Sequence, residues 1–200
     1  DGTKGILSGY QAKDNRIKWT INPNPDGFIK NFERAIGLCK GEIIFLCDQD
    51  DVWYKNKIEM HIRVYQEAGV SWVYNKVVLI NDDDKEIGYL EDTAPDYYKK
   101  RRLLDNTWGS CILGCATSYR AQGLLKALPV GKYAPAHDSW IQLAMFPKKS
   151  VCIDKVLQDY RIHVNNTAGW GHVPTKEREK QAIENNLRYL KSLSTNKNLA

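Results

Sequence analysis

The segment that most constrains the fold is a short apolar run that ends in a cluster of acids. Residues 42–47 read Glu-Ile-Ile-Phe-Leu-Cys after Gly41, and Asp48, Asp50 and Asp51 follow directly. A bounded apolar run of this length predicts a buried strand. In open α/β sheets, ligands bind at the carboxyl ends of strands. Carboxylates this close repel one another unless a cation lies between them, and Mg²⁺ combines one or two carboxylates with phosphate oxygens. The segment therefore predicts a metal-assisted site for a phosphorylated substrate.

Helical and strand patterns alternate through the first 80 residues. The periodicity predicts helices over 3–14, 28–40 and 55–68, and strands over 16–22, 42–46 and 71–80. In the third helix, Ile58, Ile62 and Tyr65 are expected to face the core. This alternation is typical of an α/β fold with a mostly parallel, Rossmann-like central sheet and flanking helices.

The second half of the chain is less regular. Short strands are expected near 112–119, 150–154 and 157–161, and helices over 122–128, 138–146 and 175–193. With 200 residues, the chain is long enough for one α/β domain with a substantial core.

Charge and cysteine content restrict the partners and the compartment. A formal net charge of +5 suits anionic ligands, but the basic residues are spread along the chain, so no nucleic acid partner is expected. The basic run at 99–102 leaves two interpretations open, peripheral contact with anionic lipid and a solvated surface. Five cysteines without CxxC spacing, three of them in apolar segments, favour reduced thiols in a cytoplasmic protein. No apolar run approaches the length needed to span a bilayer.

Two later segments carry groups that could do chemistry. His137 and Asp138 stand at the start of a predicted helix, where Asp138 either caps the helix or faces a pocket as a carboxylate base. Further on, a predicted strand ends in Arg161 and His163. Arg161 could pair with phosphate, and His163 is either a metal or phosphate ligand or an uncommitted loop residue.

Other residues near these segments have competing interpretations. The acidic triplet at 82–84 lies in a polar turn and is predicted to be solvated. Asp51 is either a third site residue or the cap of the following turn. Trp53 either walls a pocket or belongs to the core.

Taken together, these segments resemble family 2 glycosyltransferases, and more closely their bacterial rhamnosyltransferase-like branch. The boxes that carry the resemblance are DQDDVW at 48–53, HDSW at 137–140 and YRIH at 160–163, followed by Asn166 and Gly169. The resemblance implies a GT-A-like fold with the catalytic domain over 1–173 and an amphipathic C-terminal helix over 174–200. The first three residues resemble the end of the family's DDGSTDGT segment, which implies that the family's first strand would lie upstream.

The resemblance also implies roles for individual residues. Asp50 and His163 would hold Mg²⁺ or Mn²⁺ on the donor diphosphate, and Asp48 would reach the ribose or the sugar. Asp138 would deprotonate the acceptor hydroxyl in an inverting transfer. The other implied substrate contacts are Gly114, Cys115, His137, Trp140 and Arg161. The implied donor is a dTDP- or UDP-sugar, dTDP pointing to rhamnose. The implied acceptor is a glycan or lipid-linked glycan of bacterial surface polysaccharide synthesis, met in the cytoplasm or at the inner face of the membrane.

Two alternatives compete with this interpretation. The spacing Asp48-x-Asp50-x-Val52 after an apolar strand also fits haloacid-dehalogenase-type phosphohydrolases, in which the first acid is a nucleophile. That class would hydrolyse simple phosphate esters. The second alternative is a catalytically inactive fragment that binds nucleotide or glycan without turnover.

Overall fold

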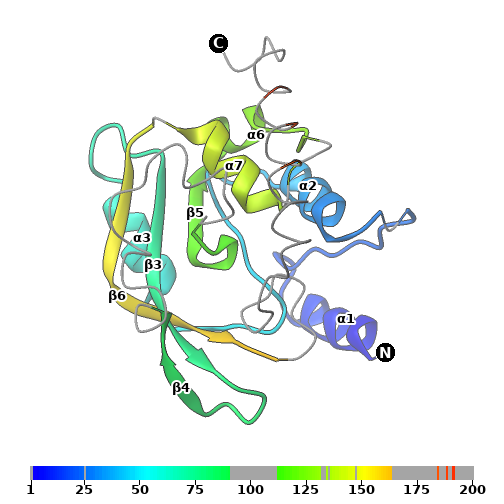
Figure 1. The fold of residues 1–200 in the computed structure, drawn as a ribbon. Helices are drawn as coiled ribbons and strands as arrows, with labels where there is room; N and C mark the ends of the chain where they lie inside the picture. Colours follow the sequence, from blue (N-terminus) through cyan, green and yellow to red (C-terminus); the bar gives the residue numbers. More distant parts are fainter. Residues whose placement is uncertain are drawn as a thin grey trace.

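The computed structural model describes residues 2–24, 26–90, 112–131, 134, 136–146 and 148–163, together with the single residues Glu184, Arg188 and Lys191. Its elements, in chain order, are α1 (Thr3–Lys13), α2 (Phe28–Leu38), β1 (Ile43–Phe45), β2 (Val52–Trp53), α3 (Lys57–Val64), β3 (Trp72–Ile80), β4 (Glu86–Tyr89), a 3₁₀ turn at Gly114–Ala116, β5 (Thr117–Arg120), α6 (Ala121–Lys126), α7 (His137–Met145) and β6 (Ser150–Arg161). Figure 1 shows a sheet flanked by helices.

The sheet has the strand order β1-β5-β3-β6-β2, with β4 also paired to β3. Among the described strands, β3 and β6 pair in parallel and the other four pairs are antiparallel. The expectation of a mostly parallel sheet is therefore wrong, because β5 inserts between β1 and β3 and runs against both. It follows that β1, β3 and β6 share one direction, so their carboxyl ends lie at the same edge of the sheet.

Strand β3 lies at the centre and contributes to hydrophobic clusters on both faces of the sheet. Trp72 and Tyr74 join a cluster with buried residues of α2, α6 and α7, whereas Val73 joins a cluster with Tyr65 at the end of α3. Successive side chains of a strand point to opposite faces, so a strand covered by helices on both sides reads as a continuous apolar run. In Figure 1, α6 lies beside β5 and α2 lies beside α7, while α3 lies against β3 and β6.

Helix α2 follows directly from its sequence. Phe28, Phe32 and Ile36 recur every four residues and so lie on one face, of which Ile36 is buried. Gly27 precedes the helix with φ of 85°, a left-handed conformation that glycine adopts without steric cost. The helix packs on α7, and this contact brings Phe32 against His137.

Three local expectations differ from the structure. Residues 16–22 form no strand and pair with none of the described strands. The two strands expected over 150–154 and 157–161 are one strand, β6, whose register against β3 shifts beside Lys76.

The inner face of α3 also differs, because Lys57 and His61 are buried there whereas Ile58 and Ile62 are exposed. Tyr65 is buried as expected. Polar partners in the sheet compensate the two buried polar side chains, so apolar character alone misled the prediction.

Some expectations concern residues outside the described part of the chain. The basic run at 99–102 lies there, and of the helix expected over 175–193 only three exposed helical residues are described. Within the described ranges, no helix is both long and apolar enough to cross a bilayer.

Candidate active site

The topology gathers four chain segments at one edge of the sheet. The acidic loop, defined as residues 48–51, follows β1, the turn at 81–85 follows β3, and Arg161 and His163 lie at and beyond the end of β6. Because β5 runs in the opposite direction, the 3₁₀ turn that precedes it reaches the same edge. This edge is where open α/β sheets bind ligands.

The two expected metal ligands are in direct contact at this edge. The Nε2 atom of His163 lies 2.9 Å from Oδ2 of Asp50, and each side chain is 20% exposed. Two neighbouring ligands of an octahedral Mg²⁺, each about 2.1 Å from the ion, stand about 3 Å apart. The spacing of the pair is compatible with two neighbouring ligands of such an ion, and its role as a metal site stays a prediction.

The other two acids of the loop face a buried thiol. Ligand atoms of Asp48, Asp51 and Cys115 all lie within 4.8 Å of one another. Burial, followed by the charges of Asp51, Asp50 and Asp138, raises the pKa of Asp48 to about 6. Burial beside the carboxylates raises the pKa of the Cys115 thiol well above its ordinary value, so Cys115 lies in the cluster as a neutral group.

Asp51 ties the acidic loop to β6. Its Oδ2 accepts a hydrogen bond from Nε2 of Gln158 at 3.2 Å, and its Oδ1 accepts one from the backbone N–H of Arg161 at 3.1 Å. Both partners lie more than 100 positions after Asp51 in the chain. Asp51 thus contacts β6, and its role as a third site residue stays a prediction.

A buried lysine, Lys57, contacts the 3₁₀ turn and β6 next to the acidic loop. The Nζ of Lys57 donates to the carbonyl oxygen of Cys115 at 2.7 Å and to Oε1 of Gln158, and it lies 4.2 Å from the ring centroid of Trp53. Burial lowers the pKa of Lys57 to about 8. Sequence reasoning missed this residue, although Lys57, His61 and Val64 share a helix face at the spacing i, i+4, i+7.

Asp138 is held at the start of α7 by two backbone donors. Its Oδ2 accepts from the N–H of Gly114 at 3.1 Å and its Oδ1 from the N–H of Ser139 at 2.7 Å. A Cβ on Gly114 would lie 3.1 Å from the Asp138 Cβ, so glycine permits this close approach. Gly114, which donates to Asp138, directly precedes Cys115, whose thiol lies within 4.8 Å of the Asp48 carboxylate. The charge of Asp138 also contributes to the raised pKa of Asp48.

Two expected substrate contacts are buried next to Asp138. His137 is 6% exposed and stacks on Phe32 with 3.8 Å between ring centroids, and neither ring nitrogen finds a hydrogen-bond partner in the part of the chain that the structure describes. Burial lowers the pKa of His137. Trp140 is 3% exposed, and its Nε1 donates to the carbonyl oxygen of Ala127 at 2.6 Å. Both occupy core positions here, and their contact with substrate stays a prediction.

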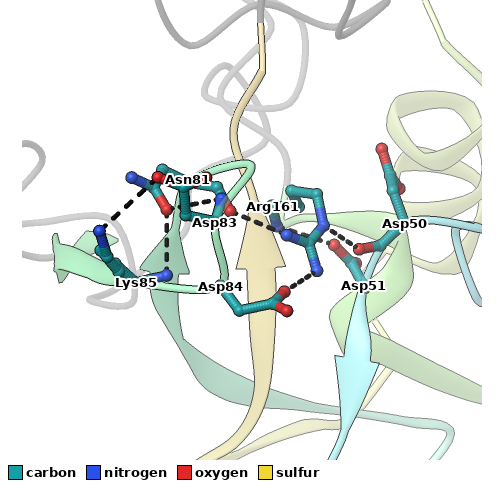
Figure 2. Close-up of polar contacts among 7 residues, drawn as sticks. All are labelled: Asp50, Asp51, Asn81, Asp83, Asp84, Lys85 and Arg161. Carbon is teal, nitrogen blue, oxygen red and sulfur yellow. Dashed lines mark hydrogen bonds and ion pairs between the residues drawn. The ribbon is translucent and has the colours of Figure 1, made fainter.

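Arg161 reaches protein oxygens on two segments. Its guanidinium donates to the carbonyl oxygens of Asp50 and Asn81 and to the carboxylate of Asp84 (Figure 2). The acidic triplet at 82–84 is exposed, as expected from its sequence, but Asp84 is an ion-pair partner and more than a solvated turn residue. Contact of Arg161 with phosphate stays a prediction.

A mixed, helix-flanked sheet with this acidic edge is an α/β fold of the GT-A type, as expected from the sequence. The sequence profile of "Glycosyl transferase family 2" matches residues 1–126, and the chain belongs to this family. Membership overturns the phosphohydrolase alternative, because the DxD segment is part of the matched glycosyltransferase domain.

Relatives of known assignment support the same family. Over 107 residues, which are 54% of this chain and 40% of the relative, the chain is 30% identical to the UDP-Glc:α-D-GlcNAc-diphosphoundecaprenol β-1,3-glucosyltransferase WfgD of Escherichia coli. It is 24% identical over 169 residues to the protein named "Putative teichuronic acid biosynthesis glycosyltransferase TuaG" of Bacillus subtilis, covering 84% of this chain and 65% of the relative. The chain thus spans 40% to 65% of the length of these two relatives.

Solved structures share the fold. S. aureus TarS 1-349 in complex with UDP-GlcNAc matches with a TM-score of 0.63 at 17% identity, over 90% of this chain and 52% of that one. The mannosyltransferase PcManGT from Pyrobaculum calidifontis, in complex with GDP-Man and Mn²⁺, matches with a TM-score of 0.57 at 13% identity, over 98% and 63%. At these identities the likeness concerns the fold.

Proposed function

We propose that the chain carries the catalytic domain of an inverting, metal-dependent glycosyltransferase. The observation that carries the proposal is the contact of Asp50 with His163 at the carboxyl edge of the sheet, with Asp138 held within electrostatic reach of the same loop. The donor is a nucleoside-diphosphate sugar and the acceptor a hydroxyl of a glycan or lipid-linked glycan. The name of the relative WfgD, with its UDP-Glc donor and diphosphoundecaprenol-linked acceptor, supports this assignment.

Each residue of the site has a separate role in an inverting transfer. Asp50 and His163 would hold Mg²⁺ or Mn²⁺, which when bound offsets the charge of the departing diphosphate. Asp138 accepts the proton of the acceptor hydroxyl, whose oxygen bonds to the anomeric carbon as the bond from that carbon to the phosphate oxygen breaks. Asp48 reaches the ribose or sugar, and Gly114 and Cys115 line the space between the acids.

The nucleotide is the first property to test. UDP-sugars are named for WfgD and TarS and GDP-Man for PcManGT, whereas the motifs favour a dTDP- or UDP-sugar, dTDP pointing to rhamnose. Calorimetric titration of UDP, dTDP and GDP, each with and without Mn²⁺, is expected to give Mn²⁺-dependent binding of one nucleotide. Asp50→Asn should abolish the Mn²⁺ dependence. Equal binding of that nucleotide with and without Mn²⁺ would contradict the metal role of Asp50.

Replacement of Asp138 separates a transferase from an inactive binding fragment. In Asp138→Asn, turnover should fall by about 100-fold or more, because the isosteric amide cannot accept a proton. Mn²⁺-dependent nucleotide binding should stay unchanged. Turnover is measured as nucleoside diphosphate released in the presence of diphosphate-lipid-linked glycan acceptors. Asp154→Asn serves as the control, because the side chain of Asp154 is 84% exposed. A wild-type chain that binds nucleotide without turnover would favour the inactive fragment.

A further inference from the structure

We propose that Arg161 and Asp84 act together as positioning residues for Asp50, so that the turn between β3 and β4 is a working part of the metal site. The inference rests on the proposed function, from which Asp50 takes its role. It assigns a task to an exposed acid that sequence reasoning treated as a solvated turn residue.

One guanidinium connects the acidic loop to the turn. The Nε of Arg161 donates to the carbonyl oxygen of Asp50 at 2.9 Å, its Nη1 to the carbonyl oxygen of Asn81 at 2.8 Å, and its Nη2 to Oδ1 of Asp84 at 2.5 Å (Figure 2). All three guanidinium nitrogens are therefore engaged, and the side chain is only 17% exposed. A planar fork with fixed donor directions suits such a three-way contact, whereas an ammonium group does not.

The turn is built to present these acceptors. The side-chain oxygen of Asn81 accepts from the backbone N–H groups of Asp83 and Lys85, each at 3.0 Å (Figure 2). The backbone N–H of Asn81 donates to the carbonyl oxygen of Lys85. Asp84 has φ of 61°, a left-handed conformation that only Gly, Asn and Asp adopt readily. These contacts lie within the turn and hold its shape without Arg161. By contrast, the Asp83 side chain points to solvent, 72% exposed and 3.7 Å from the Lys85 ammonium.

The contacts place Asp50 between two groups from the end of β6. Arg161 holds its backbone carbonyl, and His163 contacts its carboxylate at 2.9 Å. With the peptide oxygen held, the Cα–Cβ direction of Asp50 is set, and the carboxylate stays beside His163. Removing the Asp84 anchor leaves the guanidinium held only by the carbonyl oxygens of Asp50 and Asn81 among these three acceptors. Asp50 is then oriented less firmly, while its own side chain is untouched.

Variants in this network can be matched with an ion pair between β6 and β3. Asp84→Asn removes the charge and tolerates a positive φ. Asp84→Gly fits the same backbone and removes the whole side chain. Arg161→Lys keeps the charge and loses the fork. The control is Asp154→Asn, because Asp154 pairs with Lys76 at 2.5 Å across β6 and β3 and is as exposed as Asp84.

The test is a titration of Mn²⁺ alone into the full chain, followed by the EPR signal of the free ion. Both Asp84 variants should weaken Mn²⁺ binding about two- to five-fold, the range set by an exposed ion pair. Arg161→Lys should weaken it about ten-fold or more, as outer-shell partners of metal ligands do. Hydrogen exchange of a peptide over 48–54 should be faster in these variants, and Asp154→Asn should match the wild type in both measurements.

The outcomes test the positioning role of Arg161 and Asp84 separately from the proposed metal role of Asp50. If folded Asp84→Asn and Asp84→Gly bind Mn²⁺ like the wild type and exchange no faster, the positioning role is overturned while the metal role of Asp50 stands. If the Asp84 variants instead bind UDP or dTDP more tightly without Mn²⁺, Arg161 is a phosphate ligand that Asp84 restrains, and the inference is likewise overturned. If the wild-type chain binds no Mn²⁺, the proposed metal role and the inference fall together.

Discussion

Lys57 shows how one buried ammonium group can compensate part of the negative charge of an acidic site. Withdrawing an ammonium group from water costs several kcal/mol, and this cost is met only when hydrogen bonds and an opposite charge are in place. Here the carbonyl oxygen of Cys115 and the amide oxygen of Gln158 accept from Nζ, and the charges of Asp51 and Asp48 act on the same group. Lys57 therefore offsets part of the repulsion within the acidic loop whether or not a metal ion is bound.

Replacing Lys57 tests this electrostatic role. Lys57→Met keeps the volume and removes the charge, so the pKa of Asp48 should rise above its value of about 6, because the carboxylate loses an attractive cation. The free energy of unfolding should fall by roughly 2–4 kcal/mol, because two buried acceptors lose their donor. NMR titration of the Asp48 carboxyl carbon and urea unfolding measure the two effects. The matched control is Lys55→Met, since Lys55 is exposed; an equal response of both variants would contradict the role.

At the level of single residues, the sequence predicted the groups that carry recognisable chemistry and missed those that support them. Asp50 and His163 were assigned to one metal, and the structure brings them together, although the role itself stays untested. The roles of Lys57, Gln158 and Asp84 depend on partners 58 to 107 positions away in the chain, and apart from the helix-face spacing of Lys57 no local pattern indicates them.

Among the elements, α7 depends on one glycine outside it. The Trp140 ring of α7 lies where a side chain of Gly131 would begin, since a Cβ there would stand 2.1 Å from the ring. The ring is buried and its Nε1 is hydrogen-bonded to Ala127, so it cannot move aside. Gly131 thus allows the backbone at this position to lie directly against the indole of the helix that carries Asp138.

Two alanine substitutions compare a rigid neighbour with a flexible one. Gly131→Ala should lower the free energy of unfolding by about 3 kcal/mol, because overpacking forces the buried Trp140 ring to shift. Gly123→Ala in α6 meets the end of the Met145 side chain at 2.8 Å. That flexible chain can rotate away, and alanine favours the helix by about 0.5–1 kcal/mol, so the net change should be near zero. Thermal unfolding of both variants measures the contrast, and equal losses would contradict it.

Elements with strong local periodicity were predicted well, and their arrangement was not. Helix α2 and strands β1 and β3 follow from apolar spacing that any local window contains. The mixed sheet was missed because β5 pairs with β1 and β3 across more than 40 residues, and nothing within its four residues indicates direction. The inner face of α3 was misassigned because burial of Lys57 and His61 depends on acceptors in the sheet.

For the molecule as a whole, a buried polar network joins α3 to the centre of the sheet. His61 is fully buried, with Nδ1 2.8 Å from the Ser118 hydroxyl and Nε2 3.0 Å from Oδ1 of Asn75, and Tyr65 contacts the same hydroxyl at 3.0 Å. Burial lowers the pKa of His61 to about 4 from an ordinary value of 6.5. The folded chain therefore keeps this imidazole neutral over a pH range in which the unfolded chain takes up a proton.

Stability should consequently depend on pH through His61. Between pH 6.5 and 4 the unfolded state binds one more proton at this residue, so its contribution to stability is complete above pH 6.5 and is lost as the pH falls toward 4. The slope approaches about 1.4 kcal/mol per pH unit. Asp48, whose pKa is raised to about 6, acts in the opposite direction within the same window. Urea unfolding of the wild type and His61→Gln across this range isolates the histidine, because their difference should narrow as the pH falls; a constant difference would contradict the prediction.

The acidic loop is completed only by chain that is made much later. Asp50 and His163 are separated by 113 positions, and Asp51 and Gln158 by 107. At roughly 5–20 residues per second, a ribosome takes on the order of ten seconds to extend the chain that far. During that interval the loop leaves the exit tunnel without the strand that orders it. A newly made chain therefore cannot bring Asp50 and His163 together before most of the described sheet has been synthesised. Under the proposed metal role, capture of the ion waits for strand β6.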